Sequence, residues 1–184
     1  MTTCHSNDSY ILALDPGNKY TGFCLVSPEL VPIRFGKELN DEVMRESAEI
    51  LSSLTFKPIT VVIERVASYG MSVGSEVFQT CEWIGRFTQE LQRYTTINYV
   101  YRKDEKLAIC HSMKANDTTI KQALVDRFAC GQSNHGKGTK KEPGFFYGFK
   151  ADVWSAFAVA VTFHDLERER KYGECKTRFE DVGY

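Results

Sequence analysis

Two of the most apolar segments of this 184-residue chain end in a carboxylate. Tyr10–Asp15 and Ile59–Glu64 each have the pattern of a short buried strand whose last residue is an acid. The carboxyl ends of strands are where α/β folds bind ligands. If the two strands are neighbours, their terminal charges repel by roughly 1 to 4 kcal/mol at about 4 Å, and a bound cation would relieve that repulsion.

A third acid, Asp152, stands in the first turn of an otherwise apolar helix. Its side chain needs a polar partner or a metal, because a bare buried charge is very costly. Three carboxylates on separate elements suit Mg²⁺ or Mn²⁺, which prefer carboxylate oxygen and retained water. The sequence therefore predicts a metal site formed by Asp15, Glu64 and Asp152.

Each acid also fits a purely structural role. Asp15 precedes Pro16-Gly17 and could form an Asx turn, Asp152 could cap its helix, and Glu64 could pair with Arg65 at the surface. Taken singly, these roles are the better explanation. Taken together, they do not explain why each of these buried elements carries an acid at its end.

The elements that must position these acids alternate between strand and helix. We expect strands at Tyr10–Asp15, Tyr20–Ser27, Leu30–Glu38, Ile59–Glu64 and Thr96–Arg102. We expect helices from Asn40 or Asp41 to about Leu54, and at Ser75–Tyr94, Asp104–Cys110, Asn116–Phe128 and Lys150–Lys171, with Gly173 ending the last. This order indicates an α/β fold in which a meander of strands precedes crossover-linked strands. It predicts one domain over residues 9–172, with a flexible tail at 1–8 and a second tail at 173–184.

The composition is that of an ordinary globular protein, with 42% hydrophobic and 26% charged residues. Its apolar stretches all fall short of the roughly 20 residues that span a bilayer, and the polar start has no signal-peptide pattern. We therefore expect a cytoplasmic protein. The six cysteines are scattered without a CxxC pair, which favours free thiols over disulfides or a zinc site.

The net charge of −1 hides an uneven distribution. Residues 102–150 hold 10 Lys/Arg against 5 Asp/Glu, whereas residues 1–101 hold 8 against 12 and residues 151–184 hold 5 against 7. A basic middle is compatible with a groove for a polyanion, and equally with lysines that only solvate surface helices.

Three segments together resemble the RuvC-type crossover junction endodeoxyribonucleases, the Holliday junction resolvases. ILALDPGNKYTGFCLV is similar to the first hairpin of that family, VVIERVASYG to its second motif and ADVWSAFAVAV to its final motif. ASYGMSVGSEVFQTCEWIGRF and GTKKEPGFFYGFKADVW resemble more closely the phage-encoded, RuvC-like branch. The resemblance runs from about Tyr10 to His164, and its ordered combination of motifs is specific where Asp-Pro-Gly alone is weak.

The resemblance implies a ribonuclease H-like fold, a five-stranded mixed sheet in the order 3-2-1-4-5 flanked by helices. It also implies a homodimer that cuts four-way DNA junctions with two Mg²⁺ or Mn²⁺ ions. Carried over by motif, Asp15, Glu64 and Asp152 become the catalytic metal ligands, with Asp15 bridging both ions. The helix at Ser75–Tyr94, with Phe78, Trp83 and Phe87, has more apolar surface than one core-facing stripe requires, so it is the candidate dimer interface, with burial inside the monomer as the alternative.

The last motif departs from the family, which has two metal-site residues three positions apart. Here that spacing gives Asp152 and Ser155, and a neutral hydroxyl is a poor metal ligand. The lysines of the family's active site have no clear counterpart either: Lys121 is the nearest candidate to stand behind the metal ligands, and a place on a solvated helix face is the better explanation for it. Two other functions stay open: another ribonuclease H-like nuclease acting on flaps or RNA–DNA hybrids, and a catalytically impaired dimer that only binds junctions.

Contacts with DNA are expected from the basic middle of the chain and from the loop after Glu64. Lysines neutralise phosphates, and aromatic rings can stack on unpaired bases. Packing against the last helix is an equally good explanation for the aromatic residues near position 146. The candidate DNA-binding residues are Lys137, Lys140, Lys141, Lys150, Tyr69 and Phe146.

Overall fold

A five-stranded mixed sheet forms the centre of the computed structural model, which describes residues 9–53, 58–68, 70 and 72–180, with the backbone alone for 173–180. The strands are β1 (Tyr10–Pro16), β2 (Tyr20–Val26), β3 (Pro32–Leu39), β4 (Ile59–Arg65) and β5 (Ile97–Tyr101). They lie in the order β3-β2-β1-β4-β5, which confirms the expected 3-2-1-4-5 arrangement. β1, β2 and β3 pair antiparallel, whereas β4 runs parallel to both β1 and β5.

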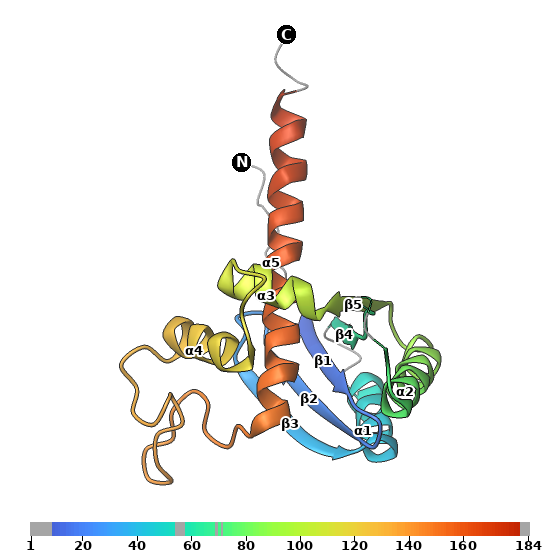
Figure 1. The fold of residues 1–184 in the computed structure, drawn as a ribbon. Coiled ribbons are helices and arrows are strands. Elements are labelled where there is room, and N and C mark those ends of the chain that lie inside the picture. Colours follow the sequence, from blue (N-terminus) through green and yellow to red (C-terminus); the bar gives the residue numbers. More distant parts are fainter. Residues whose placement is uncertain (1–8, 54–57, 69, 71, 181–184) are drawn as a thin grey trace.

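Helices cover both faces of this sheet (Figure 1). α1 (Asn40–Ser53) and α2 (Ser75–Leu91) pack on one face, against alternate residues such as Leu12 and Ile63. α3 (Arg102–Cys110), α4 (Asp117–Phe128) and α5 (Ala151–Glu180) pack on the other, against residues such as Ala13 and Val62. The strands β2, β1 and β4 are thus buried on both sides, which explains their almost continuous apolar sequences. The second face is called the α5 face below.

The core of the α5 face is built around the first half of α5, which crosses the sheet (Figure 1). Val153, Trp154 and all residues from Ala156 to Thr162 are buried. The helix then continues to Glu180, so the expectation that Gly173 ends it is wrong. A glycine in a helix interior costs only about 1 kcal/mol relative to alanine, which neighbouring residues that favour helix can offset.

Residues 129–150 connect α4 to α5 through a compact loop that is anchored by its aromatic residues. Phe146 is fully buried and packs against Phe149, Trp154 and Phe157. Gly136 has a positive φ of 77° and lies so close to Phe146 that a Cβ atom would be 2.9 Å from the ring. The loop is therefore held in one place beside α5, although it contains almost no regular structure.

The remaining expectations from composition concern membranes and cysteines. Among the described helices, none combines the length and the apolar character that a membrane crossing requires. Cys24, Cys81, Cys110 and Cys130 are free thiols, as expected. Cys4 lies outside the described residues, and only the backbone is described at Cys175.

Candidate metal centre and DNA-binding surface

Four residues of the candidate site lie in one row across the strands. Asp15 pairs in register with Gly22 of β2, and Gly22 pairs with Lys37 of β3. On the other side, the parallel pairing of Leu14 with Ile63 places Glu64 next to Asp15. All four residues share the parity of core residues on the α5 face, such as Ala13, so their Cα–Cβ directions point toward α5. The structure thus brings the two strand-end acids together.

Gly22 lets the third acid approach this row. An alanine Cβ at position 22 would lie 2.4 Å from the backbone oxygen of Asp152 and 3.0 Å from its Cβ. The first turn of α5 therefore rests directly on β2, between Asp15 and Lys37. This close contact explains why a glycine stands here in an otherwise apolar strand.

The Asp152 carboxylate forms an ion pair with the ammonium group of Lys37. It also lies close enough to Asp15 to raise the pKa of that residue. Within the described part of the chain, however, no three His, Cys, Asp or Glu side chains have the convergent geometry of a metal site. Asp152 is therefore placed beside the strand-end acids but is turned toward a cation of the protein.

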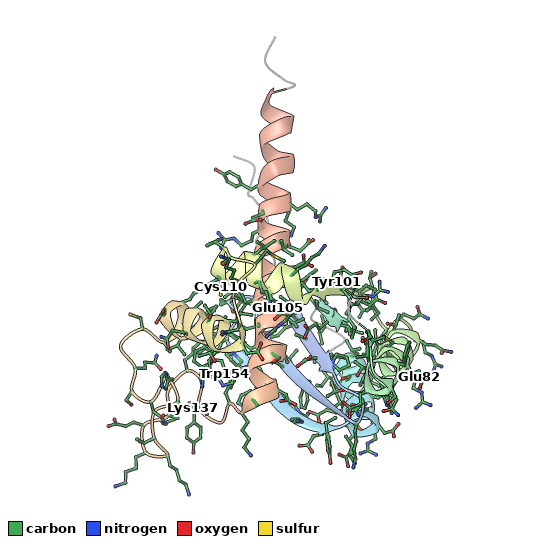
Figure 2. All side chains as sticks on the ribbon, viewed as in Figure 1. Glu82, Tyr101, Glu105, Cys110, Lys137 and Trp154 are labelled. Carbon is green, nitrogen blue, oxygen red and sulfur yellow. The ribbon has the colours of Figure 1, made fainter. Side chains whose placement is uncertain are left out.

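A further carboxylate in the cluster is Glu105 of α3. The helix starts at the carboxyl end of β5, next to β4, and its Glu105 is 0% exposed. The carboxyl groups of Asp15 and Glu64 approach within hydrogen-bonding reach, and so do those of Glu64 and Glu105. Arg102 donates to Glu105 through Nη1 and to Asp117 through Nη2. Figure 2 shows Glu105 near the middle of the molecule, beside α5.

The sequence analysis missed Glu105, Arg102 and Lys37. The segment around Glu105, RKDEKLAIC, has the composition of a solvated helix. A usable signal was topological: α3 follows a strand that ends on the same edge as β1 and β4, where ligand sites form. For Lys37 the signal was its pairing position opposite Gly22, which requires the register of the sheet.

The electrostatics of the cluster favour protons or cations. Burial, followed by the charges of Glu64 and Asp152, raises the pKa of Asp15 well above its ordinary value. Burial and the charge of Glu105 raise the pKa of Glu64 to about 7. Burial also raises the pKa of Glu105 to about 7, although the Arg102 guanidinium acts in the opposite direction. Such raised values are typical of sites where several carboxylates share one place.

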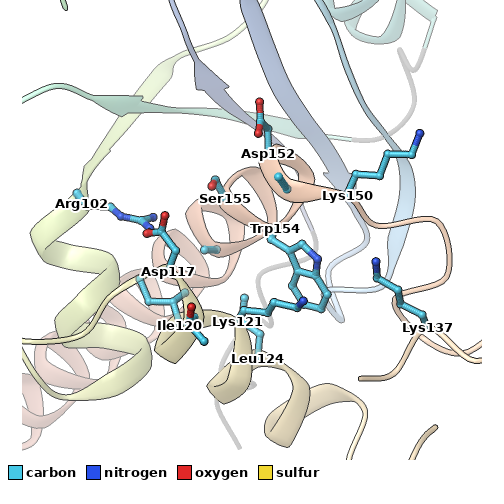
Figure 3. Close-up of a pocket in the computed structure, with 13 residues that line it drawn as sticks. Arg102, Asp117, Ile120, Lys121, Leu124, Lys137, Lys150, Asp152, Trp154 and Ser155 are labelled. Atoms are coloured by element: carbon cyan, nitrogen blue, oxygen red, sulfur yellow. The ribbon is translucent and has the colours of Figure 1, made fainter. Parts of the chain in front are cut away.

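Two cavities open beside the cluster and share Arg102 in their linings. One of about 250 Å³ is lined by Asp15, Pro16, Glu64, Arg65, Val66, Ala67 and Arg102. The second, of about 430 Å³, lies between α4, the start of α5 and the loop, and includes Asp152, Ser155, Lys121, Lys137 and Lys150 in its lining (Figure 3). Asp15 and Glu64 are thus accessible from the smaller cavity, whereas Asp152 lines the larger cavity together with the lysines.

The predicted DNA-binding lysines divide into two groups. Lys137 and Lys150 line the larger cavity, as does Lys121 of α4, whose ammonium group lies 5.1 Å from the centre of the Trp154 ring. Lys140 and Lys141 are exposed on the loop, away from the cavity lining. Ser155 lies one turn after Asp152 and lines the same cavity, half-buried (Figure 3).

Two predicted DNA-binding residues have a different outcome. Phe146 is 0% exposed within a cluster of aromatic rings, so it cannot stack on a base without leaving the core. Packing against the last helix, the alternative explanation, is what the structure shows. Tyr69 lies outside the described residues.

The chemistry of the cluster fits divalent cations such as Mg²⁺ or Mn²⁺. Its groups are carboxylate oxygens, which these hard cations prefer over nitrogen and sulfur. Glu105 also has a buried Oε1 atom without a hydrogen-bond partner among the described residues. A buried oxygen without a donor costs free energy that a cation could recover. The acids thus have the donor chemistry of a metal centre, while two of them are paired with cations of the protein, Asp152 with Lys37 and Glu105 with Arg102.

Comparison with known proteins gives matches in structure but not in sequence. No protein-family model matches the chain, and no curated protein is significantly similar to it in sequence. The structure of Thermus thermophilus RuvC superposes with a TM-score of 0.55 at 17% identity, over 88% of this chain and 97% of that one. RuvC of T. thermophilus in complex with a Holliday junction substrate gives 0.59 at 16% identity, over 88% and 96%. The yeast mitochondrial Holliday junction resolvase Ydc2 gives 0.56 at 13% identity, over 95% and 86%. The chain therefore has the ribonuclease H-like fold of the RuvC-type resolvases.

Proposed function

We propose that the protein is a divalent-metal-dependent endonuclease that cleaves four-way or otherwise branched DNA. The observation that carries the proposal is the buried row of acids at the carboxyl ends of β1 and β4, with Asp152 of α5 placed over it. Its support is that this cluster stands in the fold of RuvC and Ydc2, at the edge of the sheet where such folds bind ligands. One of these neighbours was solved with a Holliday junction substrate.

Asp15, Glu64 and Asp152 would hold the metal, in line with the motifs that the sequence shares with the family. When bound, two divalent ions generate a hydroxide nucleophile and stabilise the leaving oxygen of the phosphodiester. The protein's own part is to hold these carboxylates close together, with Asp15 and Glu64 buried, so that a cation would relieve the repulsion that raises their pKa values. Asp152 must leave Lys37 to take part.

The lysines at the larger cavity would bind the DNA backbone. Lys121, Lys137 and Lys150 present three positive charges next to Asp152 and Ser155. Each contact with a phosphate releases a counterion, which gives affinity without sequence preference. That property suits an enzyme that recognises the branched shape of its substrate more than its sequence.

A homodimer is part of the proposal, since two symmetric cuts need two active sites. α2 is the candidate interface, where Phe78 is 60% exposed and Trp83 is half-buried. Phe87 is fully buried against the sheet, so this member of the expected apolar surface belongs to the core. A sedimentation experiment that finds a fully active monomer of about the chain's own mass, 21.0 kDa, would contradict the dimer.

The test is cleavage of synthetic four-way, three-way, flap and linear duplex DNAs with Mg²⁺ or Mn²⁺. We expect the four-way junction to be cut fastest, and the variant Asp15→Asn to bind it in a gel shift without cutting it. Binding survives because it depends on lysines, whereas cutting requires the acids. A preference for flaps or RNA–DNA hybrids would favour the other nuclease function, and binding without cleavage by the parent would favour an inactive junction-binding protein.

A further inference from the structure

Glu105 is the buried residue of α3, whose other side chains are all partly or fully exposed and of which half are charged. Its Oε2 accepts a hydrogen bond from Arg102, whereas its Oε1 is buried without a donor among the described residues. The carboxyl group of Glu105 lies within hydrogen-bonding reach of the Glu64 carboxyl group, which cannot donate a hydrogen bond while it is ionised. A buried oxygen in this position is costly unless something positive meets it.

The protein's own cations do not balance the charge of this region. Five carboxylates belong to it: Asp15, Glu64, Glu105, Asp117 and Asp152. Among the described residues, two cations are paired with them, since Arg102 joins Glu105 and Asp117, and Lys37 joins Asp152. The formal excess of three negative charges lies on its buried side, where Asp15, Glu64 and Glu105 meet. One or two divalent cations would compensate it.

Ser155 leaves the last motif one carboxylate short, and Glu105 comes to the same cluster from another element. α3 begins directly after β5, so its first turn lies at the edge of the sheet where β4 ends with Glu64. Arg102 lies three residues before Glu105 and holds its Oε2, which leaves Oε1 without a partner among the described residues. The two residues form a unit that presents one carboxylate oxygen to the site.

Building on the proposed function, we infer that Glu105 is the fourth carboxylate of the metal centre, in place of the one missing at position 155. Arg102 is a positioning residue that orients it. The alternative is a structural pair in which Glu105 only neutralises Arg102.

The test is Mn²⁺ binding in the absence of DNA, measured by calorimetry and by the paramagnetic resonance of free Mn²⁺. The measurement is made at about pH 8, where ordinary carboxylates are ionised. Glu105→Gln should weaken Mn²⁺ binding at least about tenfold, as loss of a group that supports a metal does. The matched control is Asp117→Asn, because Asp117 pairs with the same Arg102 but its side chain is 88% exposed. This control should change the affinity less than about threefold, as for an exposed ion pair.

Thermal unfolding separates the two roles of Glu105. In a metal ligand, removing the charge relieves repulsion in the metal-free protein, so Glu105→Gln should unfold at the same or a higher temperature in chelator and gain less from Mn²⁺. In a structural partner of Arg102, the variant should unfold at a lower temperature in chelator and gain as much from Mn²⁺ as the parent. The second pattern, or an affinity equal to that of Asp117→Asn, would overturn the inference.

Two further variants keep the test decisive. Ser155→Asp added to Glu105→Gln should restore most of the Mn²⁺ affinity, and no recovery would contradict the exchange of position 105 for position 155. If Glu105→Gln does not fold, Glu105→Asp keeps the charge but shortens the side chain, and unchanged Mn²⁺ affinity would then count against a ligand. Because Mn²⁺ binding is measured without DNA, the inference and the proposed function can fail separately. If the parent does not cleave DNA but Glu105→Gln weakens Mn²⁺ binding, the nuclease is refuted and the metal site is not. If the parent cleaves DNA but Glu105→Gln leaves the Mn²⁺ affinity unchanged, the role of Glu105 is refuted and the nuclease is not.

Discussion

Lys37 of β3 and Asp152 of α5 form an ion pair over Gly22, two strands away from Glu64. The pair occupies the end of the row that also contains Asp15, so the Lys37 ammonium lies where a cation bound to Asp152 would lie. Both side chains are partly exposed, so the pair is screened by water and contributes little stability. Lys37 would therefore compete weakly for the Asp152 carboxylate with a metal bound as we propose.

Replacing Lys37 by glutamine should increase the affinity for Mn²⁺ measured without DNA. The variant frees Asp152 and removes a positive charge from the site. Exposed ion pairs contribute about 0.2–1 kcal/mol, so the gain should be at most about fivefold. Lys19→Gln is the control. The ammonium groups of Lys19 and Lys37 lie 5.4 Å and 5.5 Å from the centre of the same Tyr20 ring, but the Asp152 carboxylate is paired with Lys37. A lower affinity in Lys37→Gln would mean that the lysine orients Asp152 for the metal.

Substituting Gly22 with alanine should destabilise the protein and reduce cleavage. The new methyl group would lie 2.4 Å from the Asp152 backbone oxygen, so the first turn of α5 must move away from Asp15. Such overpacking costs about 1–3 kcal/mol, measured by urea unfolding. Gly85→Ala in α2 is the matched control, since nothing lies within 4 Å of its Cβ and a helical alanine should stabilise by about 0.5–1 kcal/mol. Full stability and activity in Gly22→Ala would show that α5 does not rest on this glycine.

How much of this site the sequence could predict depends on where each residue lies. Asp15, Glu64 and Asp152 mark the ends of strongly apolar segments, and the strand order makes the first two neighbours, so their proximity followed from pattern and topology. Glu105 reverses the usual pattern, because in α3 the acid is buried while Leu107 is 46% exposed. A prediction based on hydrophobic periodicity therefore assigns the buried and exposed faces of this helix incorrectly.

The residues of the loop show a different limit. Phe145, Phe146 and Tyr147 are adjacent and similar in type, yet Phe146 is buried and Tyr147 is 44% exposed. Phe146 contacts Gly136 and the ring of Trp154, and both contacts form only in the folded chain. Sequence type alone gives no information about which of three aromatic residues faces the core. The strand order, in contrast, was implied by the resemblance of the sequence motifs, and the structure confirms it.

The metal-free protein should lose stability as the pH rises from about 5 to about 8. The unfolded chain ionises Glu64 and Glu105 near the ordinary value of about 4.5, whereas the folded chain holds their protons until the pKa of about 7. Between these values the folded state binds more protons, so raising the pH favours unfolding. In the presence of a chelator, the urea midpoint should fall over this pH range for the parent and fall less for Glu64→Gln. Comparing the two proteins removes the contribution of the other groups that titrate in both. Mn²⁺ should remove most of the fall, because it binds the ionised carboxylates. Equal slopes for parent and variant would contradict the raised pKa of Glu64.

The lysines of the loop should separate by position when their effects on DNA binding are compared. Lys137 lines the cavity beside Asp152, whereas Lys140 and Lys141 are exposed on the loop near the Gly138–Pro143 bridge. Each lost phosphate contact should reduce the slope of log affinity against log salt by about 0.9. The triple change of these lysines to glutamine should therefore weaken junction binding and flatten its salt dependence.

Lys137→Gln alone should also slow cleavage at saturating DNA, because that lysine is next to the acids. The double variant Lys140→Gln with Lys141→Gln should leave the rate at saturating DNA unchanged. A slope that stays the same in the triple variant would show that these lysines only solvate the loop, and the DNA surface would then have to lie around Lys121 and Lys150.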